Sequence, residues 1–349
     1  MPRKPTARAR AAAGSLRELI AGSRPGEPLP PVRELAGRWS VHASTVCRLL
    51  QDFSDEGAAW RSPAGRYHAA GGRASRLKGR SLCFVGREMN RWGRRYRELL
   101  EGVAEVCSAN GGNLVLVSSP SLVVQRSPED VPRFAAAKRQ ARALRDCLAR
   151  APRDAAGFVF DHLWGEPLVA AAAAAGREKR SMLLPGALSP CRPDYGQGAA
   201  LACAHARRAG YGRIVVARPF AGDPAIDAII ASVENAADLP VGVAAAESGA
   251  QCRGLLRAAA AGRGRTCVMV PEDNAALRFA ALLEACGSGP DKTGLLALQG
   301  TGAVASPITH LRYDYRRIGR ATAAGILHGR RPFVAPASLV LGRTTSGGR

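Results

Sequence analysis

Two stretches near the start of the chain, LPPVRELA at residues 29–36 and VHASTV at residues 41–46, decide how this part folds. Pro31 is placed to open a short helix that runs to Trp39, and the second stretch leads into a helix over residues 44–56. A further short helix is expected over residues 15–20. Three short helices in succession, the last two joined by a tight turn, predict helix-turn-helix architecture.

The helix expected over residues 44–56 has one apolar stripe, at positions i, i+3, i+4 and i+7. The stripe consists of Val46, Leu49, Leu50 and Phe53. Its burial leaves four other side chains toward solvent, namely His42, Ser44, Thr45 and Arg48. An exposed polar helix face of this kind can enter the major groove of DNA. Plainer roles stay open: two hydroxyl residues can simply cap the helix, and the other two can be ordinary surface residues.

A small β-hairpin is expected after this helix. Residues 58–61 and 66–69 are typical of two strands, and residues 62–65 of the turn between them, with Arg66 near the tip. Such a wing would lie along the backbone of a duplex. On the preceding short helix, Arg33 can contact a phosphate or be a solvated helix charge.

Residues 13–70, called the head below, are expected to form one domain, and about residues 16–69 resemble the winged helix-turn-helix domain of GntR-family regulators. The resemblance rests on the LPPVRELA and VHASTV stretches. It implies that Arg33 contacts a phosphate and that Ser44 and Thr45 meet the groove. The chain departs from the family pattern at Ala43 and Cys47, where arginine is usual, and at the wing, where Gly65 alone remains of a Gly-x-Gly.

The charge of the chain points to a polyanionic partner. There are 50 Lys and Arg residues against 28 Asp and Glu, a formal net charge of +22. The density is highest in residues 1–80, which carry 15 basic and 6 acidic side chains. Residues 1–12 are expected to be a disordered basic arm, and residues 71–80 a basic linker. Double-stranded DNA is therefore the expected partner of the head.

Beyond residue 80, short apolar runs bounded by glycine or proline alternate with helical stretches. The runs cover residues 81–85, 113–117, 157–160, 182–184, 214–217, 241–245, 266–270 and 294–298. Helices are expected over residues 96–109, 135–149, 198–209, 250–261 and 274–286. Strands that alternate with helices predict βαβ units and parallel sheets. The predicted fold class is α/β: a small winged helix-turn-helix domain followed by two lobes with parallel sheets.

Ligands of such sheets bind at the carboxyl ends of the strands, so the loops there are the place to look for a site. The candidate effector-binding residues are Asn90, Trp92, Asp161, Trp164, Phe220, Asp273 and Gln299. Carboxylates and amides among aromatic rings suit a sugar, whose hydroxyls need acceptors and whose ring faces stack on indole. Alternatively, Asp273 only caps the helix after it, and the two tryptophans pack inside the lobes or between them.

Several short motifs after residue 80 resemble the effector-binding domain of LacI/GalR-type repressors, which is itself similar to periplasmic sugar-binding proteins. They are DYGQG at 194–198, followed by His205 and GYGRI at 210–214, VPEDNAA at 270–276, YDY at 313–315 and LVLGRTTS at 339–346. The resemblance implies that Asp273 hydrogen-bonds an effector. An arginine that often follows the fifth strand in that family is missing, with Ile226 and Asp227 near its expected place.

The same resemblance implies where the lobes divide. Lobe 1 is expected at about 81–189 and 303–325, and lobe 2 at about 190–302 and 326–349. A GntR-type head on a LacI-type core is the arrangement of arabinose-repressor-like proteins. It implies a ligand-responsive transcriptional regulator, a repressor that binds a palindromic operator as a homodimer and responds to a sugar. The alternatives are a regulator whose core only dimerises and has lost effector binding and, disfavoured by the basic head, a transport-type sugar-binding protein.

Other classes of protein are disfavoured. The chain has no Gly-x-Ser-x-Gly elbow, phosphate loop, His-Glu-x-x-His or Rossmann glycine fingerprint, so we expect no enzyme, no catalytic residue and no cofactor. Its nine cysteines form no Cys-x-x-Cys pair and are expected to be small buried hydrophobes, with no metal site. No apolar run approaches the roughly 18 residues of a membrane helix, and no signal core follows the basic start. A cytoplasmic protein without a membrane partner is expected.

Overall fold

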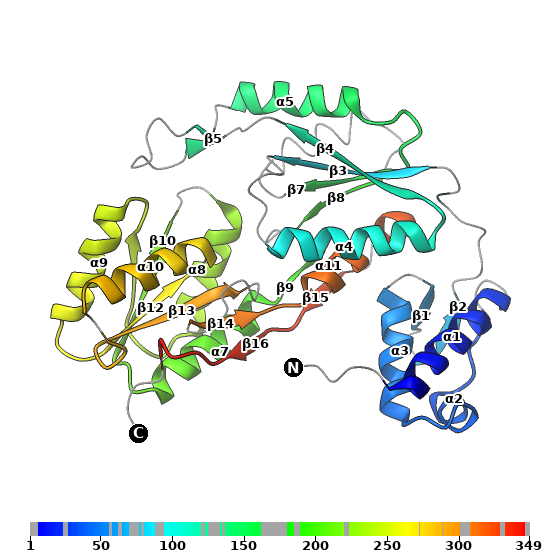
Figure 1. Cartoon of the computed structure of the whole chain (residues 1–349), viewed down its shortest axis with the longest axis horizontal. Helices are drawn as coiled ribbons and strands as arrows, with labels where there is room; N and C mark the ends of the chain where they lie inside the picture. Colours follow the sequence, from blue (N-terminus) through cyan, green and yellow to red (C-terminus); the bar gives the residue numbers. More distant parts are fainter. Residues whose placement is uncertain are drawn as a thin grey trace.

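A computed structural model of the 349-residue chain shows a small helical head beside a two-lobed core (Figure 1). The residues that the structure describes are 6–23, 27–55, 58–61, 65–69, 77, 80–87, 94–119, 123–124, 133–134, 137–161, 180–184, 189–219, 223–271, 273–287, 289–300, 308–328 and 332–345.

The head contains three helices and a hairpin. Its elements are α1 (Ala7–Gly22), α2 (Val32–Arg38), α3 (Ala43–Asp55), β1 (Ala59–Arg61) and β2 (Tyr67–Ala69). They enclose one apolar cluster, in which Leu16 of α1, Leu35 of α2 and Leu50 of α3 are fully buried. Because β1 and β2 pair antiparallel, the predicted winged helix-turn-helix fold is confirmed.

The first helix begins earlier than the sequence predicts. A disordered arm is expected over residues 1–12, but α1 begins at Ala7, and residues 1–5 lie outside the described part of the chain. Thr6 caps the helix, since its Oγ1 accepts a hydrogen bond from the Ala9 N–H at 3.2 Å. Ala9 and Ala12 are buried, so packing reinforces the high helix propensity of this alanine-rich run. The prediction of an arm is therefore wrong for residues 7–12.

The first lobe is built on a parallel sheet of four strands in the order β4-β3-β7-β8. Its elements are β3 (Ser81–Arg87), α4 (Arg94–Ala109), β4 (Asn113–Ser119), α5 (Ala137–Arg150), β7 (Gly157–Asp161) and β8 (Arg180–Leu184), with a separate small pair of β5 (Val123–Val124) and β6 (Arg133–Phe134). Helix α5 covers one face of the sheet, and α4 covers the other together with α11 (Tyr315–His328) (Figure 1).

The second lobe has a six-stranded sheet in the order β11-β10-β12-β13-β14-β16, parallel except for β16. Its strands are β10 (Arg213–Arg218), β11 (Val241–Ala245), β12 (Thr266–Val270), β13 (Thr293–Gly300), β14 (Thr309–Arg312) and β16 (Ser338–Val340). Its helices are α7 (Tyr195–Arg208), α8 (Pro224–Ala236), α9 (Gly249–Ala261) and α10 (Asp273–Ala285). The first two pack on one face and the last two on the other. All eight predicted strands of the core are confirmed, as is the α/β class.

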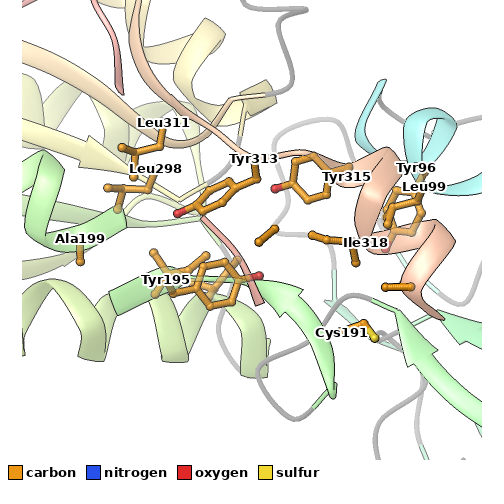
Figure 2. Close-up of a cluster of buried hydrophobic side chains, with 14 of the residues drawn as sticks. Tyr96, Leu99, Cys191, Tyr195, Ala199, Leu298, Leu311, Tyr313, Tyr315 and Ile318 are labelled. Atoms are coloured by element: carbon orange, nitrogen blue, oxygen red, sulfur yellow. The ribbon is translucent and has the colours of Figure 1, made fainter. Parts of the chain in front are cut away.

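The chain passes between the two lobes beside a cluster of three tyrosines. Figure 2 shows Tyr195, Tyr313 and Tyr315 between apolar side chains of the two lobes, and the Tyr195 and Tyr313 rings meet edge to face with centroids 6.2 Å apart. Two short strands beside them, β9 (Cys191–Pro193) and β15 (Phe333–Ala335), pair in parallel. One apolar cluster therefore runs without a break from the second lobe into the first.

The lobe boundary expected at about residue 303 is wrong. Strand β14 still belongs to the second sheet, where Leu296 of β13 is in register with Thr309. The chain leaves that sheet only between Arg312 and Tyr315, and α11 then packs on α4 of the first lobe. The pairing of β14 with β13 on one side and with β16 on the other holds this segment in the second sheet.

Two further features differ from the sequence predictions. Helix α8 was not expected, although Asp223 and Pro224 are a helix-start signal: the Asp223 carboxylate accepts hydrogen bonds from the N–H groups of Ala225 and Ile226 at 2.9 and 3.4 Å. In the segment expected to be a linker, Leu77 is fully buried in the cluster that fills the lobes. The attachment to the core thus begins before residue 80.

The cysteines follow the prediction with two exceptions. Seven of them are buried thiols, and burial raises the pKa of the Cys107 and Cys267 thiols to about 12. Cys47 and Cys286 are exposed, so the prediction of burial is wrong for these two. No group of three or more potential metal ligands occurs among the residues that the structure describes.

Candidate DNA-binding surface and ligand cleft

The start of α3 is held by His42. The Ser44 N–H donates to the His42 Nδ1 at 3.3 Å, the Ser44 Oγ lies 2.8 Å from the same nitrogen, and the Thr45 N–H donates to the His42 carbonyl at 2.9 Å. The His42 ring thus provides an acceptor for a backbone N–H of the first turn, and the ring itself is exposed. Ser44 and Thr45 lie within the helix, so the alternative that they cap it is wrong. His42 is the capping residue, which sequence reasoning missed.

The rest of α3 divides as the apolar stripe predicts. Val46, Leu50 and Phe53 are buried in the head, while Leu49 is half-buried at its edge. The opposite face exposes Ser44, Cys47 and Arg48, with a half-buried Thr45 beside them. This face carries hydroxyl, thiol and guanidinium groups on a rigid helix, which is the chemistry that reads base edges and phosphates in a major groove.

The cations of α2 differ in their partners. Arg38 forms an exposed ion pair with Glu34 at 3.0 Å, one helical turn away. Arg33 is exposed and has no ion pair within the described ranges of the chain. Its guanidinium is therefore available to an external anion without the loss of an internal contact.

The wing is shaped by a glycine and an arginine. Gly65 has φ +84°, in the left-handed region that favours glycine. The Arg61 Nε donates to the Gly65 carbonyl at 3.1 Å, and its guanidinium lies 5.7 Å from the centre of the Tyr67 ring. Arg66 follows the turn and is exposed. Arg61 thus stabilises the hairpin, and the exposed Arg66 stays a predicted contact of the wing.

The expected ligand site falls at the carboxyl edges of the two sheets. In the second lobe, Asp273 begins α10 directly after β12, and Gln299 lies near the end of β13. Because β12 and β13 are neighbouring parallel strands, with Val270 opposite Ala297, both positions belong to the same edge of the sheet. Gln299 is buried, with an exposed fraction of 4%.

In the first lobe, β3 and β7 are neighbouring parallel strands, and their arrowheads in Figure 1 point to the side of the second lobe. Asp161 is the last residue of β7, so its backbone lies at that edge. The remaining predicted positions, Asn90, Trp92, Trp164 and Phe220, together with the side chains of Asp161 and Asp273, lie outside the described part of the structure. Of the predicted positions, the structure therefore places Asp161, Asp273 and Gln299 at the carboxyl edges of the two sheets.

The structure also adds a cation to this edge that the sequence analysis missed. Arg218 is the last residue of β10, which pairs with β12, and its Nη2 lies 3.2 Å from the Asp227 Oδ1 on α8. The chain lacks the expected arginine near Ile226 and Asp227. Arg218, at the end of β10, places a cation close to that region. Its position two residues before Phe220 is the signal that could have found it.

Comparison with known proteins gives a fold. No model of a protein family matches the sequence, and no curated protein matches it. Among solved structures, a probable staphylococcal maltose operon transcriptional repressor has a TM-score of 0.61 at 11% identity, covering 78% of this chain and 99% of that one. The lac repressor dimer bound to operator and an anti-inducer has a TM-score of 0.58 at 14% identity, covering 76% and 94%.

A LacI family transcriptional regulator from Mycobacterium smegmatis has a TM-score of 0.57 at 18% identity, covering 76% of this chain and 99% of that one. The two lobes alone make up about three quarters of the chain, which is about the share of the chain that these structures cover. These likenesses show that the chain has the two-lobed fold of LacI-type regulators. No helix in the described ranges is both long and apolar enough to cross a lipid bilayer.

Proposed function

We propose that this protein is a DNA-binding transcriptional regulator, and not an enzyme, whose operator affinity is controlled by a ligand bound between the lobes. The observation that carries the proposal is the union in one chain of a winged helix-turn-helix head, with Ser44 and Arg48 exposed on α3, and a core with the fold of LacI-type regulators. Residues proposed to contact DNA are Arg33, His42, Ser44, Thr45, Arg48 and Arg66.

The resemblance of the head to GntR-family regulators supports a dimer on a palindromic operator, because a single short winged helix reads few base pairs. We place the dimer contact in the core. Sedimentation at micromolar concentration should show a dimer, and a monomer both with and without DNA would contradict this arrangement. A cytoplasmic location follows from the same function.

Control by a ligand is proposed to follow from linkage. A ligand that binds the closed form of the lobes better than the open form shifts the equilibrium toward closure. The crossing helix α11 contacts both α4 of the first lobe and α3 of the head, and it follows directly after β14 of the second lobe. Movement between the lobes can therefore reach α3 and alter the spacing of the two heads of a dimer.

The DNA contacts are tested by two variants of the same helix. Arg33→Ala removes the cation without an ion pair, and Arg38→Ala removes the cation that Glu34 already neutralises. On an operator selected from a random pool, Arg33→Ala should weaken binding to all sequences alike and lower the slope of log K against log salt by about 0.9. Arg38→Ala should change the slope much less. Equal slopes for wild type and both variants would contradict the head's proposed role.

Base recognition is tested separately with Thr45→Ala. Loss of a base contact costs about 1–3 kcal/mol at one position and relaxes the preference there, without a uniform loss of affinity. A repeated selection with the variant should therefore return a changed consensus. An unchanged consensus would remove Thr45 from the proposed reading face.

The ligand is proposed to be a sugar or a similar small polar compound, bound by Asp273 and Gln299 with Asn90, Trp92, Asp161, Trp164 and Phe220. In Asp273→Asn a hydrogen bond of about 1.5–3 kcal/mol is weakened, while any capping oxygen is kept. The variant should need at least about tenfold more effector for operator release and should bind operator normally. Equal affinities by calorimetry would leave Asp273 a cap. If no sugar of a broad panel raises the melting temperature, the core only dimerises.

A further inference from the structure

More than half of the chain's positive charge lies outside the head. Residues 81–349 carry 35 basic and 22 acidic side chains, a net charge of +13. Neither the head's DNA contacts nor a neutral ligand between the lobes uses this charge. Much of it gathers on helix α5, where Lys138, Arg139, Arg142 and Arg145 are all exposed.

These four cations lie on one face of α5. At 3.6 residues per turn they fall within an arc of about 120°, and the first and last are about 10 Å apart along the axis. The opposite side of the helix is apolar, and its Leu144 and Cys147 are buried against β3, β4 and β7. Packing on the sheet therefore fixes the helix so that the basic face points outward.

The basic face has little internal compensation. None of the four cations forms an ion pair within the part of the chain that the structure describes. Asp146 is the single acidic residue of the helix. At the end of the helix, the Arg150 Nη2 donates to the Ser118 carbonyl at 2.9 Å, which ties α5 to β4. Four unpaired cations on a rigid support repel one another, so an external polyanion should bind there.

The chemistry of this face favours a duplex over a lipid surface. Helices that bind membranes insert large apolar side chains beside their cations. On α5 the large apolar residues Leu144 and Leu148 face the sheet, and the exposed face holds only charged residues and alanine. A duplex needs no insertion: it carries one phosphate charge per about 1.7 Å of axis with both strands counted, so a 10 Å row of cations lies along a stretch that carries about six of them.

The position of α5 separates this face from the head. Helices α4 and α11 cover the other face of the first sheet, and the head's α3 contacts α11 on that side (Figure 1). We propose that the basic face of α5 is a second, sequence-independent binding surface for double-stranded DNA. It engages a segment other than the one in contact with the head. This inference goes beyond the proposed function and does not require the head to bind DNA.

The test uses the full chain and a 30-base-pair duplex without an operator. The α5 variant is Arg139→Gln with Arg142→Gln and Arg145→Gln. The matched control removes the same charge from exposed arginines at α9 and just after it, by Arg253→Gln, Arg257→Gln and Arg263→Gln. Both are made with and without Arg33→Ala and Arg48→Ala in the head, and fluorescence anisotropy is measured from 50 to 200 mM salt.

We expect the α5 variant to lower the salt slope by about 2–3, since each lost phosphate contact removes about 0.9. At 50 mM salt its affinity for the duplex should fall at least about tenfold in either head background, and the α9 control should change much less. Restoring the charge with Lys at the same three positions should restore the slope. Circular dichroism should show the same helix content in all variants.

Two outcomes would overturn the inference. The first is an equal loss in the α5 and α9 variants, because the effect would then be one of net charge alone. The second is loss of binding to vesicles that contain phosphatidylserine while duplex binding is unchanged, which would assign the face to lipid. Failure of the proposed function looks different: the head substitutions would leave binding to a selected operator unchanged, whatever α5 does.

Discussion

The crossing of α4 and α11 provides a demanding test of the core. Gly319 of α11 lies so close to α4 that a Cβ added there would stand 2.0 Å from the Leu99 carbonyl oxygen. Gly102 of α4 meets the backbone of Arg316 in the same way. An ordinary contact needs about 3.4 Å, so Gly319→Ala must push the helices about 1.4 Å apart. Buried side chains at this crossing, such as Leu99 and Ile318, would lose contact.

The expected energy combines two opposing effects. Alanine is a better helix former than glycine by about 1 kcal/mol, which favours the variant. Overpacking a close-packed core costs about 1–3 kcal/mol, and more where backbone must move, as it must here. We therefore expect a net loss of about 1–2 kcal/mol and a fall of a few degrees in the melting temperature.

A matched control separates these effects. Gly254 lies in the middle of α9, and an added Cβ there meets nothing within 4 Å. The same substitution, Gly254→Ala, should stabilise the protein by about 0.5–1 kcal/mol. Urea and heat denaturation of both variants, followed by circular dichroism, give the comparison. If Gly319→Ala stabilises as much as Gly254→Ala, the helices are farther apart than described and the reasoning is wrong.

Three further predictions concern single side chains. Burial and then the charge of Arg208 lower the pKa of His205, so the unfolded chain takes up a proton at higher pH than the folded chain. The free energy of unfolding should therefore fall as the pH drops below about 6.5. Urea midpoints measured across this range should fall less in His205→Gln than in the wild type. A bulky maleimide on Cys47 should abolish the preference for a selected operator over other duplexes and be blocked by bound operator, whereas the same label on Cys286 should leave that preference intact; equal effects at both thiols would argue against α3 as the reading helix. Asp223→Ala should cost about 1–2 kcal/mol by removing the buried cap of α8, and an unchanged melting temperature would show that the cap contributes little.

Local patterns predicted most of the fold. The stripe of Val46, Leu50 and Phe53 determined which face of α3 is buried, and alternating apolar runs located the core strands, because these signals depend on neighbours in the sequence. The lobe boundary at about residue 303 was misjudged, because it depends on the pairing of β14 with β13 and β16, which no local apolar pattern signals. Helix α8 was missed although its Asp-Pro start is a local signal.

The candidate sites were less accessible to sequence reasoning. The exposure of Arg33 and Arg48 follows from helix periodicity, but the capping of α3 by His42 requires a ring geometry that the sequence does not encode visibly. The pairing of Arg38 with Glu34, which sets Arg38 apart from Arg33, has a local signal in their i,i+4 spacing that was overlooked. The strand ends with Asp273 and Gln299 were found because parallel sheets always gather their carboxyl ends at one edge.

The position of α11 has a consequence during biosynthesis. The first lobe's strands end at β8, but α11, which shares the cover of one face of their sheet with α4, begins about 130 residues later. At about 5–20 residues per second, a ribosome needs roughly 7–26 s to supply it. During that interval Leu82 and Phe84, buried in the finished protein, lack part of their cover. A nascent chain at this stage should depend on holding chaperones, and a chain that terminates before residue 315 should be degraded even though every strand of its first sheet is present.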